Sequence, residues 1–155
     1  MLTPLKRQKT LRGHGSFAII ASRYNAPYVD SMLAAAQRVL AEAGIKKIRV
    51  VRVPGAFEIP AVAARLARAR PPCSAMICLG VIIRGQTAHA QQIADAVSLA
   101  LAQLQIQHAL PVIHEVLLLE NRAQAEARCL DKKHNRGAEA AQTALEMARV
   151  MESLP

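Results

Sequence analysis

Apolar residues along the chain follow two kinds of pattern, which alternate from Ser16 onward. Short, nearly continuous apolar runs are typical of buried β-strands. They cover Ser16–Ser22 and residues 46–54, 74–83 and 111–119. Between and after these runs, apolar residues recur at every third or fourth position, which is the spacing of one helical face. The helical stretches cover residues 28–43, 59–70, 87–107, 121–131 and 136–151.

This alternation of strands and helices predicts a parallel sheet with helices on both faces, because each crossover helix returns the chain to the start of the next strand. We expect a basic N-terminal arm, residues 1–15, and then one α/β domain, residues 16–155. The domain is a single three-layer α/β/α unit with a four-stranded parallel sheet, flavodoxin-like in type. Ligands of such sheets bind beyond the carboxyl ends of the strands. For the first three strands these ends fall at residues 23–25, 54–58 and 83–87, and in the fourth strand we expect the ligand at the end of VIHEV, residues 112–116.

The composition agrees with this fold. Hydrophobic residues make up 52% of the chain but aromatic residues only 3%. The core must therefore consist of Ala, Val, Leu and Ile, the usual filling between helices and a parallel sheet. No apolar run reaches the roughly 18 residues of a membrane span, and the N-terminus lacks a signal-peptide stretch, so we expect a cytoplasmic protein. Three cysteines without a framework spacing argue against a disulfide scaffold.

The formal net charge of +9 indicates an anionic partner. Its densest stretches are residues 6–12, 46–52 and 132–136. None of them is interleaved with aromatic side chains that could stack on bases, which disfavours nucleic acid as the main partner. An anionic small-molecule substrate or a solvated basic surface fits this charge better.

The first candidate chemistry lies in Gly80–His89, which reads GVIIRGQTAH. Gly85 permits a tight turn where the backbone approaches a ligand. Gln86 and Thr87 then open a helix, and the first N–H groups of a helix, with a Thr hydroxyl, form an anion site. His89 follows in the first turn and titrates near neutrality, which suits proton transfer. Taken alone, this pattern more often reflects ordinary helix capping.

Three further features suit a ligand. The segment VPGAFEIP, Val53–Pro60, bends the chain after the second strand, and its Phe57 lies in a loop rather than in a core run. Tyr24, beside Asn25, follows the first strand, where an aromatic ring can stack on a flat ligand. Arg128 has the bidentate donors that phosphate prefers. Each feature alone also has an ordinary interpretation, as a hydrophobic staple, a turn tyrosine or a surface arginine.

The order and spacing of these segments resemble those of the lumazine synthases, the enzymes of riboflavin biosynthesis that make 6,7-dimethyl-8-ribityllumazine. The resemblance extends from about Ser16 to Met151. Its most specific part is VPGAFEIP followed by GVxIRGxTxH. The resemblance as a whole is carried by five segments: YN at 24–25, VPGAFEIP at 53–60, GVIIRGQTAH at 80–89, ENRAQAEAR ending at Arg128 and NRGAEAAQTALEMA at 135–148.

The resemblance implies a reaction and an assembly. Family members condense 5-amino-6-(D-ribitylamino)uracil with 3,4-dihydroxy-2-butanone 4-phosphate and release phosphate and water, the penultimate step of riboflavin biosynthesis. They need no metal and no organic cofactor, so we expect none here. Their active sites lie between neighbouring subunits of a pentamer, which stays alone, pairs as a decamer or builds an icosahedral 60-mer. A riboflavin synthase is a candidate partner.

The resemblance also implies a role for each matching residue. His89 would move protons during imine formation and phosphate loss. Gln86, Thr87 and Arg128 would bind phosphate, and Lys132 aligns with a family lysine near the site but ranks behind Arg128. The ribitylaminouracil would contact a larger set, which consists of Tyr24, Asn25, Ala56, Phe57, Glu58, Val81, Ile82, Ile83 and His114.

The largest departure from the family pattern lies in the fourth strand. The family usually reads F-G-V-L-T there, whereas this chain reads H-E-V-L-L from His114. The family phenylalanine comes from a neighbouring subunit, as the residue matching Arg128 does, and covers the bound heterocycle. His114 can still stack, but it adds polarity and a proton. Smaller departures are Gln86, where Glu or Ala is common, and Ala90, which replaces an aromatic residue.

These departures leave alternatives open. The histidine at position 114 permits a lumazine- or flavin-binding module without synthase activity, although His89 and Arg128 argue against it. The charge of +9 permits a structural shell or a nucleic-acid-binding particle. An unrelated flavodoxin-like protein is a third alternative, which the joint motifs disfavour. Residues 128–137 show no obvious insertion relative to shell-forming members, which favours the 60-mer over the smaller assemblies.

Overall fold

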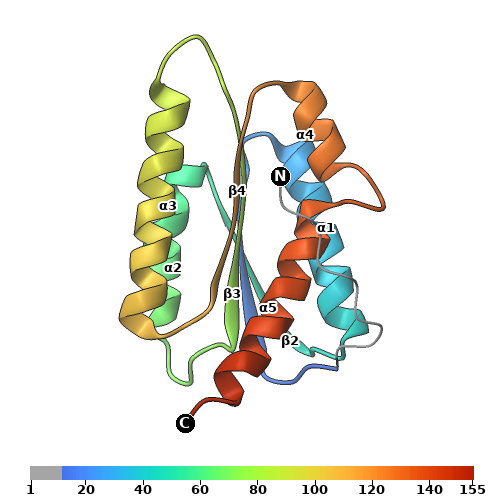
Figure 1. Ribbon diagram of the computed structural model, residues 1–155, viewed down its shortest axis with the longest axis vertical. Coiled ribbons are helices and arrows are strands. Elements are labelled where there is room, and N and C mark those ends of the chain that lie inside the picture. Colours follow the sequence, from blue (N-terminus) through green and yellow to red (C-terminus); the bar gives the residue numbers. More distant parts are fainter. Residues whose placement is uncertain (1–11) are drawn as a thin grey trace.

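The computed structural model describes residues 12–155, and within them four parallel strands form one sheet between two layers of helices (Figure 1). The elements are β1 (Ser16–Ser22), α1 (Ala26–Glu42), β2 (Lys47–Val53), the 3-10 helix η1 (Ala56–Glu58), α2 (Ile59–Ala67), β3 (Ala75–Ile83), α3 (His89–His108), β4 (Val112–Leu119), α4 (Arg122–Cys129) and α5 (Arg136–Glu152). The strand order is β2-β1-β3-β4. The predicted three-layer α/β/α, flavodoxin-like fold is confirmed.

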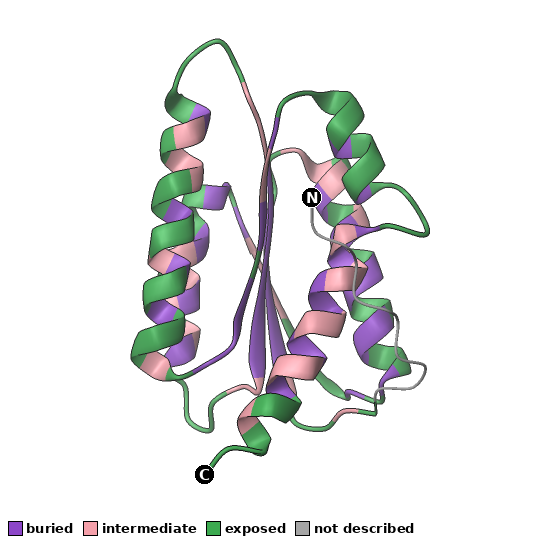
Figure 2. Cartoon of the chain, in the orientation of Figure 1, coloured by how far each residue is buried: buried purple, intermediate pink, exposed green. Residues whose placement is uncertain are grey.

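The two faces of the sheet carry two separate cores. Helices α2 and α3 cover one face, and α1, α4 and α5 cover the other (Figure 1). Successive residues of a strand point to opposite faces, so Met76 and Cys78 of β3 pack under α2 and α3, while Ile77 and Leu79 pack under α1 and α5. The two central strands, β1 and β3, are buried on both faces (Figure 2). This double burial is why their sequences are continuous apolar runs.

Helix boundaries differ from the sequence prediction by a few residues. Helix α1 begins at Ala26, earlier than predicted, because Asn25 turns the chain with a left-handed φ of 58° and Pro27 fits the first helical turn. Helix α2 ends at Ala67 rather than at Arg70. Pro71 and Pro72 follow, and the residue before a proline is disfavoured in the helical region.

The predicted N-terminal arm lies mostly outside the described residues. Its last part, residues 12–15, runs along the helices of one face, where the Gly13 N–H donates to the Ala43 carbonyl at 2.9 Å. His14 lies 3.0 Å from the Glu152 carboxylate at the end of α5. The boundary between arm and domain at residues 15 and 16 remains a prediction. Over residues 12–155, the helices are too short or too polar to cross a membrane.

Candidate active site

A cavity of about 670 Å³ opens beside the carboxyl ends of β1, β2 and β3, on the side covered by α2 and α3. Gly55, Gln92, Ile93 and Ala96 form part of its wall. The rest of the wall is a set of nine residues that the sequence predicted for the site. They are Tyr24, Asn25, Ala56, Phe57, Glu58, Val81, Ile82, Ile83 and His89. The fold therefore brings the segments at 24–25, 53–60 and 80–89 together around one space.

The turn after β1 presents Tyr24 and Asn25 to this cavity. The Tyr24 N–H donates to the Pro54 carbonyl at 3.0 Å, which ties the turn to the loop after β2. Asn25 donates its side-chain amide to the Val81 carbonyl at 2.8 Å and so links β1 to β3. The Tyr24 ring is 68% exposed and lies against Gly55, where a Cβ would come within 2.9 Å of the ring. A side chain at position 55 would therefore displace the Tyr24 ring and the Glu58 carboxylate from their positions.

The loop after β2 is held by its own glutamate. The Glu58 carboxylate accepts a hydrogen bond of 2.8 Å from the Gly55 N–H and caps η1. This bond commits one carboxylate oxygen of Glu58 to the loop. Phe57 lies between Gly55 and Glu58 in the sequence and is 60% exposed, although it is large and apolar. Two exposed aromatic rings, those of Tyr24 and Phe57, therefore lie at the mouth of the cavity.

The segment between β3 and α3 forms an exposed loop above the cavity. Arg84 anchors it, because its N–H donates to the Leu119 carbonyl at 2.8 Å and its guanidinium lies 3.0 Å from Glu120. His89 is the first residue of α3, and its backbone N–H points to the Thr87 hydroxyl at 3.4 Å. Gln86 and Thr87 are exposed and are not part of the cavity wall. The partial positive charge at the start of α3 nevertheless favours an anion beside this loop.

Three predicted site residues lie away from the cavity. His114 sits on edge strand β4, and its Nε2 lies 2.8 Å from the Ser98 hydroxyl of α3. Arg128 and Lys132 belong to α4 and the following loop, on the opposite side of the sheet from α3 (Figure 1). All three are exposed. Within the single chain, the structure therefore separates these residues from the nine that line the cavity.

A buried ion pair was missed by the sequence analysis. Glu115 of β4 is 4% exposed, and its carboxylate accepts from the Arg136 Nε at 2.7 Å. Arg136 also donates to Glu139 at 2.7 Å. Burial raises the pKa of Glu115, and Arg136 opposes this rise only in part. Burial lowers the pKa of Arg136, but the two carboxylates outweigh it and raise that pKa overall. A glutamate inside the apolar run VIHEVLLL was the available signal.

Replacing Arg136 with alanine is expected to lower the free energy of unfolding by about 3–5 kcal/mol at pH 8, because it leaves the Glu115 carboxylate buried and unpaired. The loss of Arg136 raises the pKa of Glu115 further above its usual 4.5. Because this pKa is raised in the folded state, the loss of unfolding free energy is smallest at a pH below the usual pKa. It is largest at a pH above the raised pKa. Chemical denaturation at pH 5 and pH 8 measures it. The control is the double variant Glu115→Gln with Arg136→Ala, whose loss of unfolding free energy should not depend on pH. If Arg136→Ala alone loses the same free energy at both pH values, the prediction is wrong.

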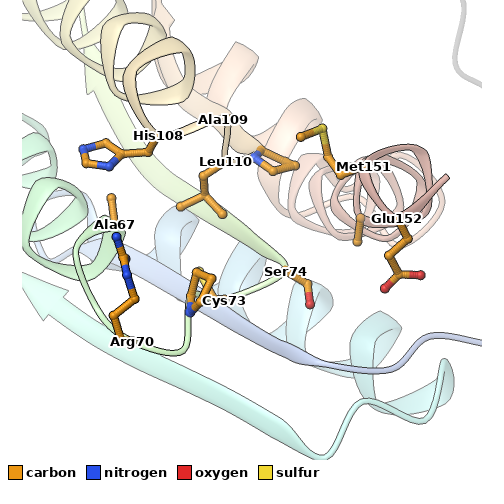
Figure 3. Close-up of a pocket in the computed structure, with 12 residues that line it drawn as sticks. Ala67, Arg70, Cys73, Ser74, His108, Ala109, Leu110, Met151 and Glu152 are labelled. Carbon is orange, nitrogen blue, oxygen red and sulfur yellow. The ribbon is translucent and has the colours of Figure 1, made fainter. Parts of the chain in front are cut away.

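A second cavity, of about 350 Å³, lies at the opposite, amino-terminal end of β3 and β4 (Figure 3). Arg70, Cys73, His108 and Glu152 line it, and none of them was predicted for the site. Among residues 12–155, no group of three or more His, Cys, Asp or Glu side chains is placed to hold a metal ion. The residues predicted for the site therefore meet at the carboxyl end of the sheet and not at this second cavity.

Comparison with known proteins agrees with this convergence. Residues 14–152 match the family model described as 6,7-dimethyl-8-ribityllumazine synthase. The chain belongs to the 6,7-dimethyl-8-ribityllumazine synthase family. Proteins of that name from Stenotrophomonas maltophilia (strain R551-3) and Xanthomonas oryzae pv. oryzae (strain PXO99A) are each 45% identical over 141 residues. The aligned region covers 90% of this chain, 90% of the first protein and 91% of the second.

Family membership confirms the resemblance that the motifs indicated. The chain is accordingly an enzyme of the lumazine synthase family, in the transferase class and in riboflavin biosynthesis. The match includes the cavity-lining segments as well as Arg128 and His114. It also excludes an unrelated flavodoxin-like protein as the identity of the chain.

Proposed function

We propose that this protein condenses 5-amino-6-(D-ribitylamino)uracil with 3,4-dihydroxy-2-butanone 4-phosphate in the cavity at the carboxyl ends of β1, β2 and β3. The observation that carries the proposal is the convergence of the segments at 24–25, 53–60 and 80–89 on one cavity of about 670 Å³. That volume lies within the range of small-molecule sites. The cavity joins an apolar wall to a few polar groups, as a site for a heterocycle requires.

Most of the cavity residues bind the substrates, and His89 transfers protons. Tyr24 stacks on the pyrimidine, the backbone of Val81–Ile83 pairs with its edge, and residues 56–58 contact the ribityl chain. His89 at the start of α3 moves protons while the amine forms an imine with the ketone and water leaves. Phosphate is then eliminated beside Gln86 and Thr87, and the ring closes with the loss of a second water. Because both substrates are already reactive, positioning supplies much of the rate.

The charge of the substrate indicates that one subunit is not enough. A phosphate ester needs cationic donors, yet among the described residues no Lys or Arg forms part of the cavity wall. Arg128 and Lys132 are exposed on the far side of the sheet. A second subunit that presents Arg128, Lys132 and His114 to the cavity completes the site. The exposed rings of Tyr24 and Phe57 at the same mouth support this arrangement.

The outer face of α3 also supports assembly into a ring. Leu99 and Ile106 are 62% and 79% exposed, and with Ala102 between them they form one stripe along the helix. An apolar stripe at this spacing is typical of a helix that packs against another helix. We place α3 at the contact between subunits of a pentamer, from which a decamer or a 60-mer can be built. A riboflavin synthase, which would consume the product, is the candidate protein partner.

Replacing His89 with alanine is expected to lower kcat by about 10²–10⁴-fold without abolishing turnover, because one acid–base group contributes about that much. Substrate positioning by the rest of the cavity remains. Steady-state kinetics with both substrates measure the effect. The matched control is His108→Ala at the other end of the same helix, which lines the distant cavity and should keep kcat unchanged. An unchanged kcat of the His89 variant excludes the proton-transfer role.

A synthase assay with both substrates tests the proposed function directly. The lumazine product absorbs and fluoresces, so its appearance and the release of inorganic phosphate are followed together. The competing candidate is a module that binds lumazine without making it, which the histidine at position 114 permits. Tight binding of the product without turnover would select that module. Turnover with stoichiometric phosphate release selects the synthase.

A further inference from the structure

His114 is exposed, although it lies between two buried residues on one face of β4. Val112 and Val116, its neighbours on the same face of the strand, are 7% and 5% exposed and belong to the core under α2 and α3. His114 pairs in register with Cys78 of β3, whereas the other edge of β4 is open in the subunit. The imidazole therefore stands at the rim of the sheet, with its body beside α3.

One hydrogen bond orients this ring. The Ser98 Oγ lies 2.8 Å from the His114 Nε2. A helical serine often bonds back to a carbonyl one turn earlier, but among the described residues Nε2 is the only partner of this hydroxyl. Ser98 thus has its proton free to donate to Nε2. When Ser98 donates this proton, the proton of a neutral imidazole lies on Nδ1, because only one ring nitrogen of a neutral imidazole donates.

The same pair is poorly suited to nucleophilic catalysis. A serine nucleophile needs a histidine that is itself oriented by a third group on its other nitrogen. Among residues 12–155, no side chain or carbonyl bonds the Nδ1 of His114. With Ser98 as the donor to Nε2, Nδ1–H is instead a donor without a partner among the described residues, on a ring that this bond orients.

We infer that Ser98 is a positioning residue, which holds His114 so that Nδ1–H donates to a carbonyl oxygen of the pyrimidine bound in the neighbouring subunit's cavity. This inference rests on the proposed function, because it requires that a second subunit completes the site. The pyrimidinedione ring offers two carbonyl acceptors, and the cavity wall already supplies the stacking ring of Tyr24. A phenylalanine at position 114 could cover the heterocycle but could not donate to it. Ser98 and His114 would therefore act as one unit in pyrimidine affinity.

The test compares Ser98→Thr with Ser98→Val, a pair of similar shape that differs in the hydroxyl. Each is made with His114 intact and with His114→Phe. With His114 intact, the valine variant should raise KM for the pyrimidine roughly tenfold, the worth of one hydrogen bond. The threonine variant should stay near the parent. kcat and KM for the butanone phosphate should not change. With His114→Phe, the threonine and valine variants should be identical, because the acceptor of the hydroxyl is gone.

Three outcomes overturn the inference. One is an equal KM for the threonine and valine variants with His114 intact. Another is a difference between them that persists with His114→Phe, which shows that Ser98 acts on packing instead. The third is a change confined to kcat. Fluorescence titration with 6,7-dimethyl-8-ribityllumazine, which keeps the pyrimidinedione, gives the same comparison without turnover. A protein that binds lumazine in this pattern but makes none refutes the proposed function and retains the Ser98 role.

Discussion

Arg128→Ala is expected to raise KM for the butanone phosphate by about 100-fold, with a much smaller effect on KM for the pyrimidine. The guanidinium is exposed in the last turn of α4, where within the subunit it contacts no part of the cavity. A bidentate contact to phosphate contributes about 1.5–3 kcal/mol per hydrogen bond to a charged group. Its loss weakens binding of the phosphate ester specifically, since the pyrimidine carries no such charge.

Steady-state kinetics with each substrate varied in turn measure this separation. Arg128→Lys keeps the charge but loses the two-donor geometry, so its KM should lie between those of the parent and the alanine variant. Arg122→Ala is the matched control, because it removes an exposed arginine from the first turn of the same helix. Unaltered KM and kcat for Arg128→Ala exclude the role of phosphate clamp.

Mixing subunits tests whether Arg128 acts across an interface. A site that takes His89 from one subunit and Arg128 from the next is defective in both single variants. When His89→Ala and Arg128→Ala subunits are unfolded and reassembled in equal amounts, about one quarter of the sites in a ring regain both residues. Activity at low butanone phosphate should then rise well above that of either variant alone. No gain after verified co-assembly places the two residues in the same subunit's site.

Gly137→Ala is expected to destabilise the protein by about 3 kcal/mol or more. Gly137 is buried in the first turn of α5, and its missing side chain lets α5 approach α1. A Cβ at this position would overlap the backbone carbonyl of Met32 in α1. Backbone atoms cannot rotate away as a side chain can, so the two helices must separate and the core between them loses contacts. Overpacking costs of about 1–3 kcal/mol, and more where the backbone must shift, are usual for such changes.

Chemical or thermal denaturation of the purified protein measures this loss, with far-UV circular dichroism as the readout. The matched control is Gly85→Ala, since a Cβ there meets nothing within 4 Å and Gly85 does not have a positive φ. That variant should keep the parent stability or gain slightly, because alanine restricts the unfolded chain. A Gly137→Ala protein as stable as the parent contradicts the close crossing of α1 and α5.

Much of the fold could be predicted because each element carries a local signature. Strand β1 was predicted with its observed bounds, since both of its faces are buried and residues 17–21 form a continuous apolar run. The end of α1 was predicted from Gly44, whose φ of 87° is readily adopted only by glycine. The end of α2 was placed too late, at Arg70 instead of Ala67, because the helical pattern of residues 68–70 continued while the two prolines beyond them acted on the backbone.

The sequence by itself determined the layered fold, the family and nine of the residues that line the cavity, because apolar periodicity and motif spacing can be read along the chain. Only the tertiary structure showed which of the predicted site residues lie at the cavity and which lie elsewhere. It gathers Tyr24, Phe57 and His89 at one cavity and leaves Arg128 exposed across the sheet. It also pairs Ser98 with His114, and Glu115 with Arg136. Contacts of this kind join residues far apart in the chain, and their partners are decided by strand order and helix packing rather than by any local pattern.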